Sequence, residues 1–213
     1  MSRGRFITLE GIEGAGKSTV AQLAREWLTA RRIPVRVTRE PGGTPIAERL
    51  RQVVLERGEE LIPPVAETLI MFAARAQHIV NVIRPALARG EWVICDRFTD
   101  ATRAYQGGGR GVDAQLIESL ARAVHGDLTI DCTLLLDLPV AAGLSRARAR
   151  LGDAAQDRFE AETLAFHERV RARYLALLDE EPERVQLIDA TAPLAEVRRQ
   201  LEAVLASLAP VRR

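Results

Sequence analysis

The stretch Gly11-Ile12-Glu13-Gly14-Ala15-Gly16-Lys17-Ser18 decides the fold of this chain, because it fits the pattern G-x-x-x-x-G-K-[ST] at every position. Glycines in such a loop let backbone N–H groups turn toward phosphate oxygens, and the following helix directs its positive end at them. Lys17 adds a cation, and Ser18 offers a hydroxyl to Mg²⁺. The sequence therefore predicts a nucleotide triphosphate site in this loop, extending to Thr19.

Lys17 is the only lysine in the chain, and every other long basic side chain is an arginine. A compact ammonium with rotatable donors suits clustered phosphate oxygens better than a planar guanidinium does. An arginine-biased genome would explain the arginines, but it would not explain the motif around Lys17. We therefore interpret Lys17 as a residue that contacts phosphate.

The elements around the loop predict the fold class. Residues 6–9 form a short apolar, β-prone run before the loop, and residues 18–31 have helical periodicity after it. Further strands are expected at 35–38, 92–95, 133–138 and 185–188. Further helices are expected at 47–56, 65–88 with an end or kink at Pro85, 114–124, 140–150, 160–178 and 194–208. Alternating strands and helices predict an α/β fold of the P-loop NTPase type, a three-layer sandwich with a five-stranded parallel sheet and helices on both faces.

Composition limits the other classes of protein. The 213 residues, 47% of them hydrophobic, are enough for one substantial core, so residues 1–213 are interpreted as a single domain. A formal net charge of +1 gives no reason to propose nucleic acid or a membrane surface as partner. We expect no signal peptide and no membrane-spanning segment, and we expect Cys95 and Cys132 to be buried free thiols. These features favour a reduced, cytoplasmic protein.

Charged residues follow two of the predicted strands. Asp96 and Arg97 end the third strand, where a carboxylate can hold Mg²⁺ and a guanidinium can bind phosphate. Arg39 ends the second strand, and ligands of open α/β sheets bind outside the carboxyl ends of strands. We expect these residues to converge with the loop on one crevice. A strand-end salt bridge and an ordinary turn arginine are the structural alternatives.

A third basic cluster, Arg146-Ala147-Arg148-Ala149-Arg150, follows the fourth predicted strand. At helical spacing Arg146 and Arg150 share a face and Arg148 points away. A mobile segment at about 146–158 with two arginines on one face is suited to close over a triphosphate as a lid. The alternative is a solvated basic helix face.

Several motifs in order make the chain resemble the bacterial thymidylate kinases over residues 6–191. They are the phosphate loop, the segments 38–44 and 71–75, Asp96-Arg97-Phe98, the run 104–111 containing Tyr-Gln-Gly-Gly-Gly-Arg-Gly, and Asp189-Ala190-Thr191. The resemblance implies transfer of the γ-phosphoryl group of ATP to dTMP with Mg²⁺, which gives dTDP for dTTP biosynthesis. It also implies a homodimer, for which residues 65–88 would supply a helical face.

The resemblance assigns roles to individual residues. Residues 11–19 and Arg146 would bind ATP, and Ser18 and Asp96 would hold the metal. Lys17, Asp96, Arg97 and Arg150 would act in catalysis. Phe72 would stack on thymine and Arg75 would bond the base edge, while Tyr105 would lie against the deoxyribose. The full acceptor set is Glu13, Arg39, Pro41, Phe72, Arg75, Arg97, Thr102, Tyr105 and Gln106.

Other interpretations remain open from the sequence alone. The chain departs from the family pattern in a longer, less charged segment at 151–156 and in Ala101, where a small hydroxyl residue often occurs. A P-loop kinase with another acceptor is the nearest alternative, and an ATP-driven switch protein is an alternative from a different class. A cis bond before Pro41 is allowed by a turn at that position but is not required.

Overall fold

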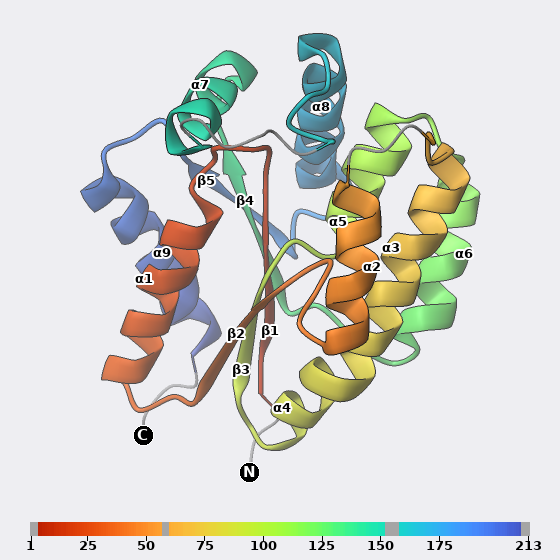
Figure 1. Cartoon of the computed structure of the whole chain (residues 1–213). Coiled ribbons are helices and arrows are strands. Elements are labelled where there is room, and N and C mark those ends of the chain that lie inside the picture. The colour runs from red at the N-terminus through yellow and green to blue at the C-terminus, as the bar shows by residue number, and fades with distance from the viewer. Residues whose placement is uncertain (1–3, 57–59, 152–157, 210–213) are drawn as a thin grey trace.

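In the computed structural model, which describes residues 4–56, 60–151 and 158–209, a central sheet lies between two layers of helices (Figure 1). All strand pairs are parallel, and the strand order is β2-β3-β1-β4-β5. The strands are β1 (Phe6–Glu10), β2 (Val35–Arg39), β3 (Trp92–Asp96), β4 (Cys132–Asp137) and β5 (Val185–Asp189). The predicted five-stranded parallel sheet is therefore confirmed.

The burial of each strand follows from its place in the order. Every residue of β1 is buried, and β3 and β4 are buried except at their last residue, because each has a neighbour on both sides and helices on both faces. The edge strands β2 and β5 are only partly buried. Largely apolar, fully buried runs such as residues 132–136 therefore mark the centre of the sheet.

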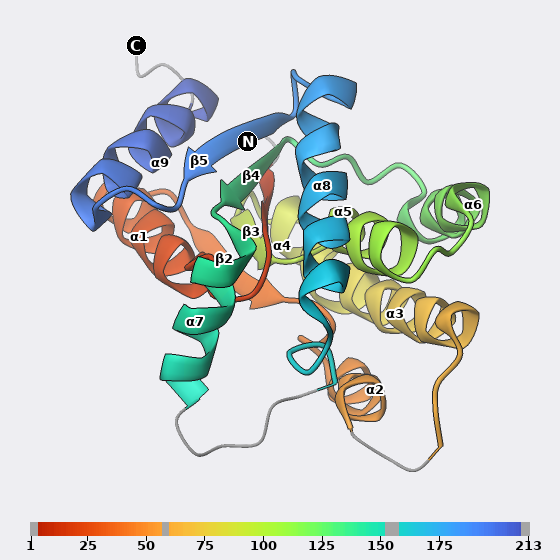
Figure 2. The same cartoon turned by 90° about the horizontal axis from the view of Figure 1, so that it is seen from above.

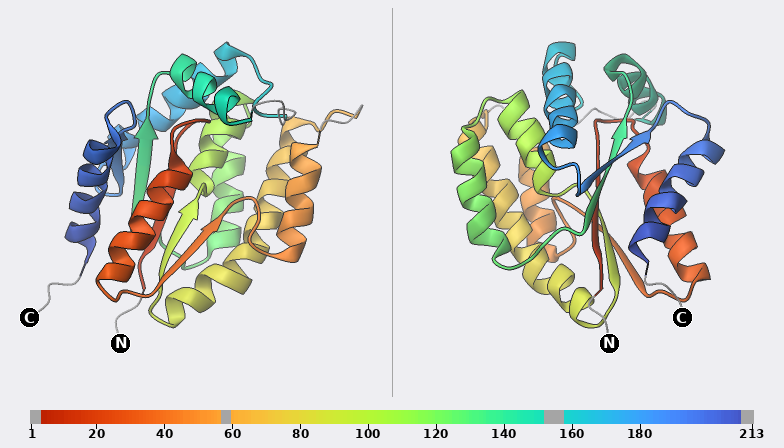
Figure 3. Two further views of the ribbon diagram at one scale, coloured as in Figure 1. Left: turned by 60° about the vertical axis from the view of Figure 1, so that its left-hand side comes forward. Right: turned by 180° about the vertical axis from the view of Figure 1, so that it is seen from behind.

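The helices α1 (Lys17–Ala30) and α9 (Leu194–Leu208) cover one face of the sheet, as the side views in Figure 3 show. Helices on the opposite face include α3 (Pro64–His78), α4 (Arg84–Ala88), α5 (Thr99–Thr102) and α6 (Ala114–His125). The core between the sheet and α1 contains Leu9, Leu23 and Leu134. This packing gives the expected three layers.

Two π-helical segments differ from the expected α-helices. The predicted helix at 65–88 is α3 followed by the π-helix η1 (Ile79–Ile83) and then α4, so the irregularity precedes Pro85. Proline has no N–H to donate to the preceding turn, and a wider turn accommodates its ring. The second segment, η2 (Arg103–Gly109), was not expected and follows α5 directly. Both segments lie beside the candidate site.

Three helices lie toward the carboxyl ends of the strands. Viewed from above (Figure 2), α2 (Pro45–Leu55), α7 (Val140–Leu151) and α8 (Leu164–Glu180) surround the edge of the sheet where β1 and β4 end. The helix expected at 160–178 starts later, because the side chain of Thr163 accepts a hydrogen bond from the N–H of Phe166 as an N-cap. These helices form the surroundings of the phosphate loop.

Both cysteines are buried free thiols, as predicted. Burial raises the pKa of Cys132 to about 12 and that of Cys95 well above its usual value, which keeps both protonated. None of the helices in the described part of the chain combines the length and apolar character needed to cross a membrane.

Candidate active site

The phosphate loop runs from the end of β1 to the start of α1 and packs against α7. Gly14 has a φ of 73°, and a Cβ added there would lie 2.0 Å from the carbonyl oxygen of Gly143. A Cβ added at Gly143 would in turn lie 2.6 Å from the carbonyl oxygen of Glu13. The loop therefore needs glycine on both sides of this contact, because the two backbones touch.

Lys17 lies folded against its own loop. Its Nζ donates hydrogen bonds to the carbonyl oxygens of Gly11 at 3.0 Å and Ile12 at 2.9 Å. Burial, and then the nearby Arg97, lowers the pKa of Lys17 to about 8. The ammonium is thus held by two backbone acceptors at the position where the motif predicts a phosphate contact.

A first cavity, which we call the Ser18 cavity, opens between α1 and the ends of β2 and β3. Its lining includes Ser18, Thr38, Arg39, Gly43 and Asp96. Asp96 Oδ1 is buried and has no hydrogen-bond partner among the described residues. A buried carboxylate oxygen without a partner, in one cavity with a serine hydroxyl, fits a hard cation such as Mg²⁺ or its water.

Arg39 belongs to this Ser18 cavity and not to the one that contains Arg97. Its Nη2 donates to the two carboxylate oxygens of Glu48 at 2.9 and 3.1 Å, and 53% of its side chain is exposed. Glu48 stands in the first turn of α2 and draws the guanidinium outward. The expected convergence of Arg39 and Arg97 on one crevice is therefore not seen, although each lines a cavity that contains a residue of the phosphate loop.

A second cavity, the Arg97 cavity, is enclosed by the loop, α3, α5, η2 and the segment after β2. It is lined by Glu13, Glu40, Pro41, Arg51, Leu55, Met71, Arg75, Arg97, Phe98, Ala101, Thr102, Tyr105, Gln106 and Phe159. Seven of the nine acceptor-site residues expected from the sequence lie in this lining, and Arg39 and Phe72 do not. The peptide bond before Pro41, left open by the sequence, is cis.

Arg97 connects the cavity to the phosphate loop. It adopts a φ of 68°, which is unusual for a residue with a side chain. Its Nη2 donates to Glu13 Oε1 at 2.8 Å and to the Tyr105 hydroxyl at 3.1 Å, and its Nη1 donates to the carbonyl oxygen of Gly11 and the Tyr174 hydroxyl. Burial would raise the pKa of Glu13, but Arg97 and Lys17 outweigh it and lower that pKa.

Arg75 is buried at the other wall of the cavity. Its Nε donates to Glu40 Oε2 at 2.7 Å, and its Nη2 donates to the carbonyl oxygen of Phe98 and to Thr102 Oγ1, both at 3.1 Å. Its Nη1 is buried without a hydrogen-bond partner among the described residues. Because a buried guanidinium N–H is costly to leave unpaired, this atom indicates a ligand acceptor in the cavity.

Phe72 does not line the cavity, and this corrects the expectation that it faces a ligand. Its ring is buried in a core cluster with Val112 and Ile117, and the guanidinium carbon of Arg75 lies 4.7 Å from its centroid. Met71, one residue earlier on α3, is half-buried and lines the cavity instead. A helix turns 100° per residue, so the two neighbours face different directions.

The two arginines expected to share a face of α7 have different partners. Arg146 Nη1 donates to the carbonyl oxygen of Ala190, just after β5, at 2.9 Å. Arg150 is 64% exposed in its side chain, and its Nη2 lies 3.4 Å from Glu160 Oε1. Residues 152–157 of the expected lid lie outside the described residues.

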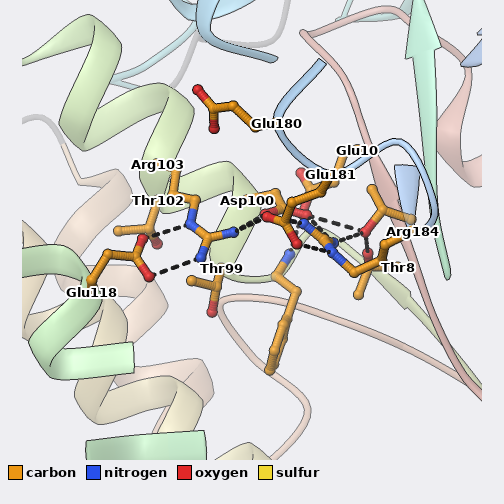
Figure 4. Close-up of polar contacts among 12 residues, drawn as sticks. Thr8, Glu10, Thr99, Asp100, Thr102, Arg103, Glu118, Glu180, Glu181 and Arg184 are labelled. Carbon is orange, nitrogen blue, oxygen red and sulfur yellow. Dashed lines mark hydrogen bonds and ion pairs between the residues drawn. The ribbon is translucent and has the colours of Figure 1, made fainter. Parts of the chain in front are cut away.

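A buried charge network supports the cavity from behind (Figure 4). Asp100 accepts hydrogen bonds from Arg103 at 2.8 Å and Arg184 at 2.6 Å, and Arg103 also pairs with Glu118. The network therefore links α5 and η2, which carry Thr102 and Tyr105, to α6 and to the start of β5. Burial alone would raise the pKa of Asp100, but Arg184 and Arg103 outweigh burial, so the pKa lies below its ordinary value.

Glu10 lies between this network and Arg97. Its carboxylate accepts from the N–H of Phe98 and from the hydroxyl of Tyr174, both at 2.7 Å. Burial, and then the charge of Asp100, raises the pKa of Glu10 to about 8. The last residue of β1 is therefore protonated at neutral pH.

The sequence analysis did not identify the apolar part of the cavity. Leu55 and Phe159 lie outside every motif named above, and Met71 lies in the segment 71–75, where Phe72 was expected to contact the ligand. Glu40 and Phe98 lie inside motifs named above but were given no role there. The need of a buried Arg75 for an acidic partner is the signal that could have identified Glu40.

Comparisons with known proteins agree with this geometry. Residues 9–201 match a family model described as thymidylate kinase. A thymidylate kinase of Pseudomonas fluorescens is 56% identical over 205 residues, covering 96% of each chain, and one of Alkalilimnicola ehrlichii is 53% identical, covering 97% of this chain and 94% of that one. The crystal structure of thymidylate kinase from Ehrlichia chaffeensis superposes with a TM-score of 0.76 at 30% identity, covering 97% of this chain and 100% of that one.

Proposed function

The chain belongs to the thymidylate kinase family of nucleoside monophosphate kinases, and from this premise we propose that it transfers the γ-phosphoryl group of ATP to dTMP with Mg²⁺. The dTDP produced would enter dTTP synthesis in the cytoplasm. The observation that carries the assignment is the pair of adjacent cavities, one with a phosphate loop and the other with an unpaired arginine N–H.

The phosphate loop and the Ser18 cavity take the ATP phosphates. Lys17 exchanges its two carbonyl partners for phosphate oxygens, with which a full ammonium charge interacts more strongly. Ser18 and Asp96 would hold Mg²⁺, which supplies charge neutralisation on the phosphates when bound. Orphaned Asp96 Oδ1 supports this assignment. Transfer between phosphates depends chiefly on positioning and charge, so no nucleophilic side chain is needed.

The Arg97 cavity takes dTMP. Arg97 binds the acceptor phosphate, Arg75 Nη1 donates to an acceptor atom on the thymine edge, and Tyr105 lies against the deoxyribose. Met71 takes the base-contacting role first expected of Phe72, because its thioether is polarizable and reaches the cavity. Pro41, Thr102 and Gln106 complete the lining.

The chain functions as one domain whose lid spans about residues 146–158. Arg146 lies near the end of β5 and contacts the adenine side of ATP, while exposed Arg150 closes over the transferring phosphoryl group. Arg150 has little to lose on moving, because its contact with Glu160 is long and solvent-exposed.

We assign a homodimer with α3 and η1 at the interface. Val65, Leu69 and Val80 expose 48%, 48% and 63% of their surface. They recur at spacings of four and eleven residues, which places them along one face of the helix. Replacing Leu69 with Glu is expected to give monomers in sedimentation equilibrium, and an unchanged mass would contradict this interface.

The decisive experiment measures Mg²⁺-dependent ADP release from ATP with each nucleoside monophosphate, and with thymidine, as acceptor. Strong stimulation by dTMP, with weaker stimulation by the other acceptors, is the expected result. Equal stimulation by another monophosphate would assign the cavity to a different base. Slow release that is indifferent to every acceptor would favour an ATP-driven switch.

A further inference from the structure

His167 is a buried histidine that the proposed mechanism does not use. It lies on α8 with no exposed surface, and neither of its ring nitrogens has a hydrogen-bond partner among the described residues. Its Nδ1 lies 3.6 Å from Glu13 Oε2, beyond hydrogen-bonding distance but close enough for an electrostatic contact. A buried imidazole with two unpaired nitrogens requires an explanation, because such groups are nearly always satisfied.

The position of His167 on α8 relates it to Arg97. Tyr174 follows seven residues later, which places it two turns along the same face of the helix. The Tyr174 hydroxyl accepts from Arg97 Nη1 at 3.2 Å, and His167 faces Glu13, which accepts from Arg97 Nη2 at 2.8 Å. One face of α8 thus approaches both the guanidinium and its carboxylate partner.

Arg97 has no terminal N–H to spare in this structure. Its Nη1 and Nη2 carry four hydrogens, and four acceptors take them: the carbonyl oxygen of Gly11, the hydroxyls of Tyr174 and Tyr105, and Glu13 Oε1. A phosphate that binds the end of this guanidinium must displace at least one of them. Glu13 is the partner that a phosphate disfavours most, because both are anions.

We propose that His167 is a positioning residue that takes over the Glu13 carboxylate when the acceptor phosphate engages Arg97. A shift of about 1 Å brings His167 Nδ1–H into hydrogen-bonding range of Glu13 Oε2. The Tyr105 hydroxyl, which donates to the same oxygen at 2.7 Å, holds the carboxylate in place during the exchange. The inference rests on the proposed function, since it requires a phosphorylated acceptor in the Arg97 cavity.

This exchange gives His167 Nδ1 a hydrogen-bond partner in the acceptor complex. A buried donor that gains a partner when the acceptor binds stabilises that complex. The effect should therefore appear in the affinity for the acceptor and not in the affinity for ATP, whose phosphates lie on the other side of the loop.

Kinetics of two variants test the exchange. His167→Phe keeps an aromatic ring but removes the donor, and His167→Asn keeps a donor near the position of Nδ1. We expect His167→Phe to raise KM for dTMP about three- to tenfold, the range of a modest hydrogen bond, with KM for ATP unchanged. His167→Asn should return KM for dTMP to within about twofold of wild type. In a Glu13→Ala background, which removes the acceptor, His167→Phe should have no further effect.

A spectroscopic signature of the wild-type protein separates positioning from packing. The chain has three histidines, so their ¹⁵N–¹H imidazole signals can be assigned by comparison with His167→Asn. Saturation with dTMP should produce a hydrogen-bonded Nδ1–H signal at His167. His125, whose Nε2 lies 2.7 Å from Thr99 Oγ1, serves as the reference that stays constant.

The outcomes distinguish this inference from the proposed function. Wild-type protein that is not stimulated by dTMP would overturn the proposed function itself. Wild-type activity with dTMP, combined with an unchanged His167 signal or with equal KM values for the Phe and Asn variants, would overturn only the role of His167. If His167→Phe does not fold, the imidazole signal of the wild-type protein decides alone.

Discussion

The phosphate loop and the Arg97 cavity lie side by side but are built in opposite ways. The loop is one continuous stretch whose backbone makes the site, and its side chains are few. The cavity is assembled from the loop, the segment after β2, α3, α5 and η2, and its charges are already paired by protein groups. A contiguous site is specified by a local motif, whereas an assembled site is specified by the packing of distant elements.

The largest effect should come from Lys17→Arg, which tests the contiguous half. The substitution keeps the charge, but a planar guanidinium cannot occupy the ammonium's position between two carbonyl oxygens. We expect turnover to fall by about 100-fold or more, comparable to losing a preorganised electrostatic contact. Coupled ADP-release kinetics measure this, and near-normal turnover would show that the loop needs only a charge.

Arg150→Ala extends the test to α7, the helix that packs against the phosphate loop. Because its charge is expected to act mainly in the transition state, kcat should fall about tenfold with little change in KM for either nucleotide. Arg148→Ala, two residues earlier on the same exposed helix end, is the matched control and should lose less. A raised KM for ATP at constant kcat would make Arg150 a ground-state contact.

A pair of variants on α3 tests the assembled half. Phe72→Ala should lower the free energy of unfolding by about 3–5 kcal/mol, because it leaves a cavity in the core. Met71→Ala should lower it less and instead raise KM for dTMP several-fold. Urea unfolding and steady-state kinetics on both variants give the comparison. The reversed pattern would restore Phe72 as the base-contacting residue.

Glu10→Gln should have the smallest effect on activity, because Glu10 lines neither cavity, and it should change the pH dependence of stability instead. The pKa of Glu10 is about 8 in the folded state against an ordinary value of 4.5. Between these values the folded state holds a proton that the unfolded state has released, so stability falls as pH rises, by at most about 1.4 kcal/mol per pH unit. Urea unfolding of both proteins across this window should show the variant gaining relative stability as pH rises. Parallel curves would indicate that Glu10 is ionised when folded.

What the sequence could predict follows the same division. The loop, the five strands and the free thiols were identified because each depends on a local pattern of a few residues. The sequence did not reveal which of Met71 and Phe72 faces the cavity. Helix α3 is buried on several sides, so either of these two adjacent apolar residues is compatible with a place beside the ligand. Arg39 illustrates a second limit. Whether its guanidinium pairs with Glu48 or with a phosphate depends on where α2 packs. The π-helical turns depend on packing around Pro85 and on the glycine-rich run, which no periodicity of 3.6 residues reveals.

The contact between Gly14 and Gly143 places a limit on how this chain can evolve. A methyl group at either position would overlap the backbone of the opposite segment, so neither position can be relieved by a compensating change at the other. Substitution in one segment therefore requires the main chain of the other to move, and with it the distance between the loop and α7. Gly14 and Gly143 are 129 positions apart in the sequence. We expect a change at either glycine to be accompanied by a change in the spacing of the two segments, and not by a single substitution at the other glycine.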